Sequence, residues 1–163
     1  MGFATHLGPW LLGTVKNTTG TTAGTIRNMG ATVVTQSATT TVSDTTATTL
    51  FVLPAGAQIN NFLVDITTAY AGTTGNTITI QTSGGTALAT VGSASTTPLA
   101  VGRATTTLSG TNIATILNVG STDLIVQVIY ACAGTASGGA ATITCSYTVR
   151  DSSGNSAPPA NQQ

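Results

Sequence analysis

The feature that most constrains this chain is its short segments of alternating apolar and polar residues, which run from residue 31 to residue 149. Such alternation is typical of half-buried β-strands. Turns rich in Gly separate the segments, and strands spaced roughly 10–14 residues apart are typical of a sandwich or barrel. No stretch has sustained helical periodicity, so we expect almost no helix. The expected strands are residues 31–36, 39–42, 48–53, 58–68, 77–81, 86–91, 98–108, 112–118, 123–131 and 141–149.

This pattern divides the chain into three parts. Residues 1–30 read as an extended N-terminal arm, because they are rich in Gly and Thr and lack a strand or helix period. Residues 31–150 form the expected all-β, antiparallel β-sandwich domain. Residues 151–163 contain no large apolar residue and two consecutive prolines, and they read as an exposed C-terminal tail.

The arm is too apolar for a plain solvated tail. It folds back on its own domain or lies across a neighbouring subunit, and we favour the second. Trp is a frequent anchor at protein interfaces, and Trp10 is the only Trp of the chain. The predicted partner-binding residues are Phe3, Leu7, Trp10, Leu11 and Leu12.

Alternation also predicts which side chains share a face. In residues 58–68, one face receives Phe62, Val64 and Ile66, and the other receives Ile59, Asn61, Leu63 and Asp65.

Residues 124–132 and 141–149 are expected to pair as a hairpin with Cys132 opposite Cys145. Tyr130 would then face Tyr147, and Val128 would face Val149, with all six side chains on one face. The two cysteines could cross-link, but two buried free thiols are favoured if the protein assembles in a reducing cytosol.

Charge is scarce: only 5% of the residues are charged, the net charge is zero and Glu is absent. The charged residues are Lys16, Arg27, Arg103, Arg150, Asp44, Asp65, Asp123 and Asp151. Four scattered cations cannot neutralise a row of phosphates, so we expect no nucleic-acid partner. The surface is either covered by other subunits or hydrated by hydroxyl groups alone, and the apolar arm favours the first.

No segment predicts a membrane protein or an exported one. No apolar run approaches the roughly 20 residues that span a bilayer. Residues 1–12 lack the basic start of a signal peptide.

Catalytic and ligand-binding patterns are also missing. His6 is the only histidine, all four Asp residues are remote from it in sequence, and no G-x-S-x-G turn accompanies any Ser. Asp65 and Asp123 could meet as a hydrolase pair, but Asp123 more plausibly ends a turn. His6 and the two cysteines lack zinc-ligand spacing, and four dispersed Asp residues disfavour calcium. We therefore predict no catalytic site, no cofactor and no metal ion.

Two further features each allow two interpretations. Arg103 is either an exposed strand residue or an ion-pair and hydrogen-bonding contact to a partner subunit, and the first is favoured. Thr-rich segments such as residues 39–41 and 105–107 suggest an ice-binding protein as an alternative. Such a protein needs a strict repeat that stacks Thr hydroxyls in a flat array, and this sequence has no constant repeat period.

A family resemblance adds to these expectations. Residues 50–70 (LFVLPAGAQINNFLVDITTAY), followed by the turn and short strand of residues 75–89, look like small β-sandwich proteins on the heads of tailed phages. The start of the arm, residues 2–10, looks like that of such proteins in short-tailed marine phages.

The resemblance implies a capsid decoration, or cement, protein with a jelly-roll-like sandwich. It further implies binding to the major capsid protein on the outer capsid surface of the virion, stabilisation of the shell by bridging its subunits, self-association (a homotrimer favoured) and assembly in the host cytoplasm. The alternative within the same virion is a head-fibre, tail or receptor-binding protein; a bacterial surface protein is a more distant one.

Overall fold

The protein is a two-layer antiparallel β-sandwich, as the alternation predicts. The computed structural model describes residues 33–72, 74–93 and 98–149. The first sheet contains, in spatial order, β1 (Val33–Thr41), β9 (Ala140–Thr148), β3 (Gln58–Thr68) and β6 (Gly102–Ala104). The second sheet contains β2 (Thr48–Leu53), β8 (Leu124–Ala133), β4 (Thr74–Thr82), β5 (Ala87–Gly92) and β7 (Thr107–Leu108).

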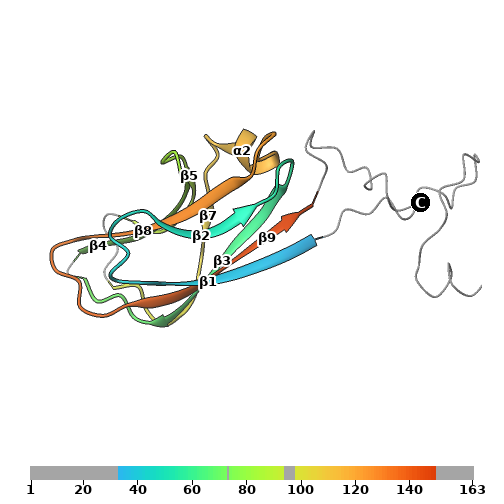
Figure 1. The fold of residues 1–163 in the computed structure, drawn as a ribbon. Helices are drawn as coiled ribbons and strands as arrows, with labels where there is room; N and C mark the ends of the chain where they lie inside the picture. The colour runs from blue at the N-terminus through green and yellow to red at the C-terminus, as the bar shows by residue number, and fades with distance from the viewer. Residues whose placement is uncertain (1–32, 73, 94–97, 150–163) are drawn as a thin grey trace, which may run out of the picture.

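The order of the strands is that of a jelly roll. Consecutive strands β1, β2, β3 and β4 alternate between the sheets, and β8 and β9 return to lie between the earlier strands of each sheet (Figure 1). Eight strands arranged as two four-stranded sheets in this nested order make the jelly-roll fold, with the two-residue β7 added at one edge. The fold class that the sequence predicted is therefore confirmed.

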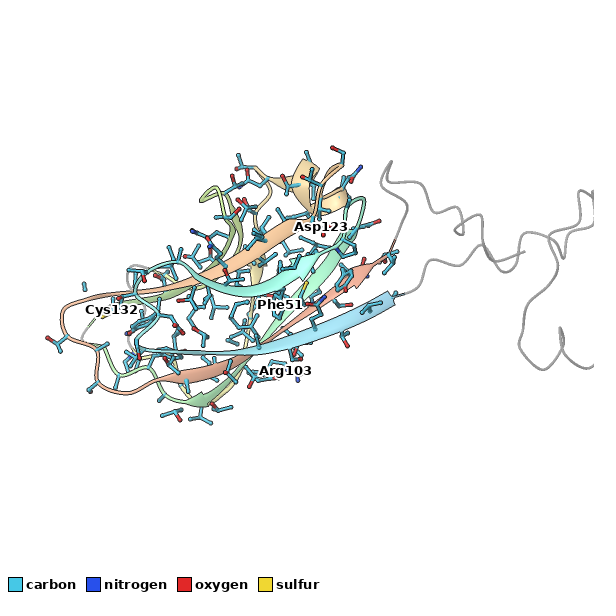
Figure 2. All side chains as sticks on the ribbon, viewed as in Figure 1. Phe51, Arg103, Asp123 and Cys132 are labelled. Atoms are coloured by element: carbon cyan, nitrogen blue, oxygen red, sulfur yellow. The ribbon has the colours of Figure 1, made fainter. Side chains whose placement is uncertain are left out.

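The interior follows from the period-2 pattern of the strands. On β9, Ala141, Ile143, Cys145 and Tyr147 are buried, whereas the Thr and Ser residues between them face outward. Phe51 lies between the sheets in the same way (Figure 2). Full burial of a large apolar side chain contributes roughly 1.5–3 kcal/mol, so these inward positions hold the two layers together.

The expected hairpin of the last two strands is wrong, and its inward face is right only in part. Val128, Tyr130, Cys145 and Tyr147 are buried as expected, but Cys132 is only partly buried and Val149 is exposed. β8 pairs with β2 and β4 in the second sheet, whereas β9 pairs with β1 and β3 in the first. The loop of residues 134–139 therefore crosses from one sheet to the other. Alternation specifies which side chains point inward, but the topology chooses the neighbouring strand.

The expected faces of β3 need one correction. Ile59 is buried together with Phe62, Val64 and Ile66, and a β-bulge between Ile59 and Asn61 explains why. The extra residue at the bulge shifts the alternation by one position, which turns Ile59 inward.

The strand expected at residues 112–118 is also wrong, because this segment forms a short helix. α2 (Ile113–Leu117) is one helical turn that buries Ile116. The segment has two apolar pairs, and its pattern suits one turn of helix as well as a short strand.

Strand boundaries change in two further places. The two expected strands of residues 31–36 and 39–42 form a single strand, β1. The expected strand of residues 98–108 is divided between β6, which pairs with β3, and β7, which pairs with β5. Each fragment thus belongs to a different sheet.

The two ends of the sandwich differ. At the terminal end, β1 begins, β9 ends, β2 turns into β3 at residues 54–57 and α2 lies nearby (Figure 1). Val33 and Thr148 are register partners there, so the chain enters and leaves the sandwich side by side. The loop end is formed by the β1–β2 loop (residues 42–47), residues 69–72 and the β8–β9 loop (residues 134–139).

Candidate interaction surface

The predicted arm contacts lie beyond the part of the chain that the structure describes. Phe3, Leu7, Trp10, Leu11 and Leu12 all precede Val33, as does His6. The boundaries of the arm and of the C-terminal tail also fall outside the described residues. These assignments therefore stay predictions.

Arg103 is an exposed strand residue that forms an ion pair within its own chain. Its Nε donates to Asp65 Oδ1 at 2.9 Å, and a second nitrogen donates to Oδ2 at 3.3 Å. The side chains are 64% and 40% exposed on the outer face of the first sheet (Figure 2). The hydrogen bond from Arg103, aided by its charge, holds the pKa of Asp65 below its usual range. This ion pair links the side chains of the neighbouring strands β3 and β6 on the surface, and it offers no reactive group.

Asp65 and Asp123 do not form a pair of facing carboxylates. Asp65 is on β3 of the first sheet, and Asp123 directly precedes β8 of the second. Asp123 Oδ1 accepts a hydrogen bond from the backbone N–H of Ala55 at 3.0 Å. Asp123 thus ties the β2–β3 turn to the start of β8, a structural role like the one its position in the sequence favoured.

The two cysteines are free thiols on strands of different sheets. Cys145 is buried on β9, and Cys132 is partly buried near the end of β8. Burial raises the pKa of the Cys145 thiol to about 12. Cys132 Sγ donates to the carbonyl of Gly134 at 3.2 Å. Among the described residues, no group of three or more His, Cys, Asp or Glu could hold a metal ion.

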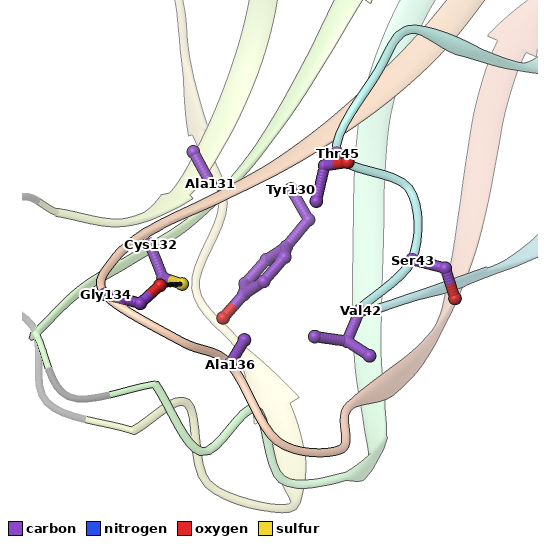
Figure 3. Close-up of a pocket in the computed structure, with 8 residues that line it drawn as sticks. All are labelled: Val42, Ser43, Thr45, Tyr130, Ala131, Cys132, Gly134 and Ala136. Atoms are coloured by element: carbon purple, nitrogen blue, oxygen red, sulfur yellow. Dashed lines mark hydrogen bonds between the residues drawn. The ribbon is translucent and has the colours of Figure 1, made fainter.

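A hollow of about 540 Å³ opens at the loop end. Figure 3 shows Tyr130 in the middle of its lining. The lining residues are Val42, Ser43, Thr45, Tyr130, Ala131, Cys132, Gly134 and Ala136. None carries a charge, and most are small.

The side chains of Ser43, Tyr130 and Cys132 in this hollow already have hydrogen-bond partners inside the protein. The Tyr130 hydroxyl donates to Asn76 Oδ1 at 2.5 Å, and Asn76 Nδ2 donates to the carbonyl of Gly72 at 3.2 Å. Burial, together with the neighbouring Cys132, raises the pKa of Tyr130. A ligand site needs a few polar groups that converge on the ligand. Here those groups stabilise the loop end instead.

Asp44 organises the β1–β2 loop at the same end. Its carboxylate accepts from the Thr41 backbone N–H at 2.7 Å and from the hydroxyls of Thr40 and Thr48. Partial burial works to raise the pKa of Asp44, but these hydrogen bonds outweigh it and lower that pKa. The Asp44 carboxylate therefore stabilises the conformation of the β1–β2 loop.

The terminal end carries most of the exposed large aliphatic side chains, beside exposed polar residues such as Asn118 and Ser121. Seven large aliphatic side chains of the described chain are exposed, and six of them lie at this end. We call this set the apolar rim: Val33, Val52, Ile113, Leu117, Ile125 and Val149. The seventh, Val101, lies beside β6 at the loop end, where Gly102 pairs with Ile66.

Two residues of the rim face outward as a cross-strand pair. Val52 on β2 and Ile125 on β8 are register partners that are 50% and 40% exposed. Both are apolar residues at outward positions, where strict alternation would place polar ones: Val52 lies between the buried Phe51 and Leu53, and Ile125 precedes the buried Val126. The unbroken apolar run of residues 50–53 is the sequence signal that could have revealed this surface.

The strand order and the packed interior define the class of this chain as a jelly-roll β-sandwich domain. None of the helices in the described segments has the length and apolar character needed to cross a bilayer. No protein-family model matches the chain, and no curated protein matches it. Among solved structures, it aligns with one chain of the cyanophage Pam1 capsid asymmetric unit. The alignment covers 74% of this chain and 87% of that chain, with 18% identity and a TM-score of 0.46.

Proposed function

We propose that this chain is a capsid decoration protein, which binds the outer surface of a phage shell and stabilises it by bridging major capsid subunits. The observation that carries this proposal is the jelly-roll order of the two sheets. The sequence of residues 50–70 resembles phage head proteins, and a jelly roll is the fold which that resemblance implies. The strand order and the sequence of residues 50–70 are separate features of the chain, and both favour the same role.

The interior argues against a metal-dependent activity of the described domain. Jelly rolls also occur among cupins and lectins. A metal site within the sandwich would need several His or carboxylate ligands, and the only histidine of the chain is His6. The interior of the described sandwich is filled instead by packed apolar side chains.

The aromatic residues argue against the alternative of a glycan-binding fibre or receptor-binding protein. Lectin-type sites commonly present an aromatic face and converging polar groups to a sugar. All five aromatic side chains of the described chain are buried: Phe51, Phe62, Tyr70, Tyr130 and Tyr147. The described surface therefore offers a sugar no aromatic platform.

Binding would stabilise the shell through buried area and repetition. A specific interface buries roughly 1,200–2,000 Å² in total. Each copy would lie across a joint between capsid subunits, so its binding free energy opposes their separation. The arm would add anchors through Trp10 and its apolar neighbours, and repetition over the shell would multiply the effect.

The test is to mix the purified full chain with expanded shells that lack it. We expect many copies per particle, spread over the shell, and a higher temperature of shell disruption. Particle images and gel densitometry would give the copy number. A few copies confined to one vertex or to the tail would support the fibre alternative, and no binding would refute the proposal.

A further inference from the structure

The terminal end of the sandwich has the composition of an interface. Charged residues are depleted from the cores of protein interfaces, and aliphatic patches on soluble domains mark contact sites. Isolated exposed aliphatic residues are ordinary. Here six of the seven exposed large aliphatic side chains of the described chain lie at one end of the sandwich, so they are not scattered singly over the surface.

The charged side chains of the described chain lie mostly away from the terminal end, where the exposed aliphatic side chains gather. Asp44 lies in the loop at the far end, and the Asp65–Arg103 pair lies on the outer face of the first sheet. Asp123 is the one charged residue of the described chain at the terminal end, and its carboxylate accepts the Ala55 N–H. An uncharged partner surface could therefore cover the aliphatic side chains of this end as long as it leaves the exposed Asp123 carboxylate in contact with water.

The backbone at this end is stiffened by hydrogen bonds between segments. The Gly56 N–H donates to the carbonyl of Gly120 at 2.7 Å, and the Val119 N–H donates to the carbonyl of Ala57 at 3.0 Å. The β2–β3 turn is thereby joined to the segment that follows α2. A partner would meet a pre-organised surface, which reduces the entropy lost on binding.

The chain beyond the described domain joins it at the same end. Residues 1–32 connect to Val33, and residues 150–163 connect to Val149, whose neighbour Thr148 pairs with Val33. The predicted anchors Phe3, Trp10 and Leu11 are therefore tethered to the end that carries the rim. A partner held by the arm is therefore connected to the chain at the end that carries the apolar rim.

From these observations, and resting on the proposed function, we propose that the protein stands on the shell by its terminal end. The apolar rim contacts an uncharged, apolar patch of the major capsid protein, and the loop end points away from the shell. The two aliphatic side chains of the Val52–Ile125 pair are part of the contact. This orientation identifies the docking surface within the sandwich itself, in addition to the arm.

The test uses a double variant, Val52→Thr with Ile125→Thr, in the full chain. Thr preserves the β-branched shape and strand propensity of both positions while it removes apolar surface. The matched control is Val101→Thr, the exposed valine at the loop end. Binding to expanded shells would be measured by co-sedimentation over a range of protein concentrations, and thermal unfolding would establish that each variant folds.

We expect the double variant to bind shells about tenfold more weakly, since it removes buried apolar surface from the contact. Val101→Thr should bind as the unchanged protein does. A third variant, Ile113→Lys, places a charge on α2 and should weaken binding further.

Other results would overturn the inference in distinguishable ways. If the unchanged protein binds shells, and both the double variant and Ile113→Lys bind as tightly as it does, the rim is not the docking surface. If the double variant shifts the emission of Trp10 to longer wavelength in free protein, the arm of the same chain covers the rim. If it dissolves an oligomer in sedimentation, the rim joins copies of this chain. Failure of the unchanged protein to bind shells would instead refute the proposed function.

Discussion

The ring of Tyr70 lies directly against the backbone of Gly139, with no space for a side chain between them. A Cβ atom at residue 139 would stand 2.8 Å from Cε1 of Tyr70 and closer still to Cγ and Cδ1. Tyr70 also packs against Tyr130, with ring centroids 4.8 Å apart, and its hydroxyl donates to the carbonyl of Thr40 at 3.2 Å. This tyrosine therefore joins β1, β8 and the β8–β9 loop at the loop end.

We predict that Gly139→Ala destabilises the fold by about 2–4 kcal/mol, because it adds both overlap with Tyr70 and backbone strain at a positive φ. Gly138→Ala is the matched control. Its φ is also positive, at 73°, but a Cβ there meets open space, so about 1 kcal/mol is expected. Urea unfolding of both variants would measure the difference. Equal losses would mean that the Tyr70 contact adds nothing.

Stability should fall as the pH rises from about 10 to about 12. Burial raises the pKa of Tyr70 from 10.0 to about 12, so the unfolded chain releases this proton before the folded chain does. The stabilisation is fully present below pH 10 and is lost through pH 12. The raised pKa values of Tyr130 and Cys145 act in the same direction.

Tyr70→Phe tests this assignment. It removes the hydrogen bond to Thr40, which costs about 1 kcal/mol at neutral pH, but it also removes one alkaline titration. Thermal midpoints recorded from pH 7 to pH 11.5 should therefore approach those of the unchanged protein above pH 10. A constant difference across that range would contradict the proposed contribution of Tyr70.

The thiols should differ in reactivity. Cys132 lies beside an open hollow, whereas Cys145 is fully buried between the sheets. We expect a thiol reagent to modify Cys132 in the native protein and Cys145 only after unfolding. Cys132→Ser should remove the native-state reaction. Intact mass measured without reductant should show two free thiols, and a mass lower by two hydrogens would reveal the cross-link instead.

Deletion of residues 1–30 should abolish or greatly weaken binding to shells while the sandwich stays folded. The deletion removes all the predicted anchors and leaves the nine strands whole. Deletion of residues 151–163, which contain no large apolar residue, is the control and should have little effect. Co-sedimentation and far-ultraviolet circular dichroism would report binding and folding. A chain without its arm that still coats shells would leave the arm with no anchoring role.

Local patterns in the sequence predict much of the secondary structure correctly. The bounds of β2 and β3, Thr48–Leu53 and Gln58–Thr68, agree with those that the alternation predicts. The inward face of β9 is also as expected. These features depend on the direction in which each Cβ points along an extended chain, which is a property of the segment itself.

Other features depended on contacts between distant segments. Nothing local to β8 and β9 indicates that they belong to different sheets, because many strands present a suitable apolar face. The bulge that turns Ile59 inward arises from its pairing with Tyr147, far along the chain. The Asp65–Arg103 ion pair likewise exists because β6 lies beside β3.

The sequence by itself determined an all-β chain with a packed interior and little charge. Period-2 alternation and composition are readable one segment at a time, and they need no knowledge of neighbours. Only the tertiary structure decided the jelly-roll order and the position of the apolar rim. Val33, Val52, Ile113 and Ile125 are dispersed in sequence, and they meet at one end because the strands reverse direction and the two sheets close over a common core.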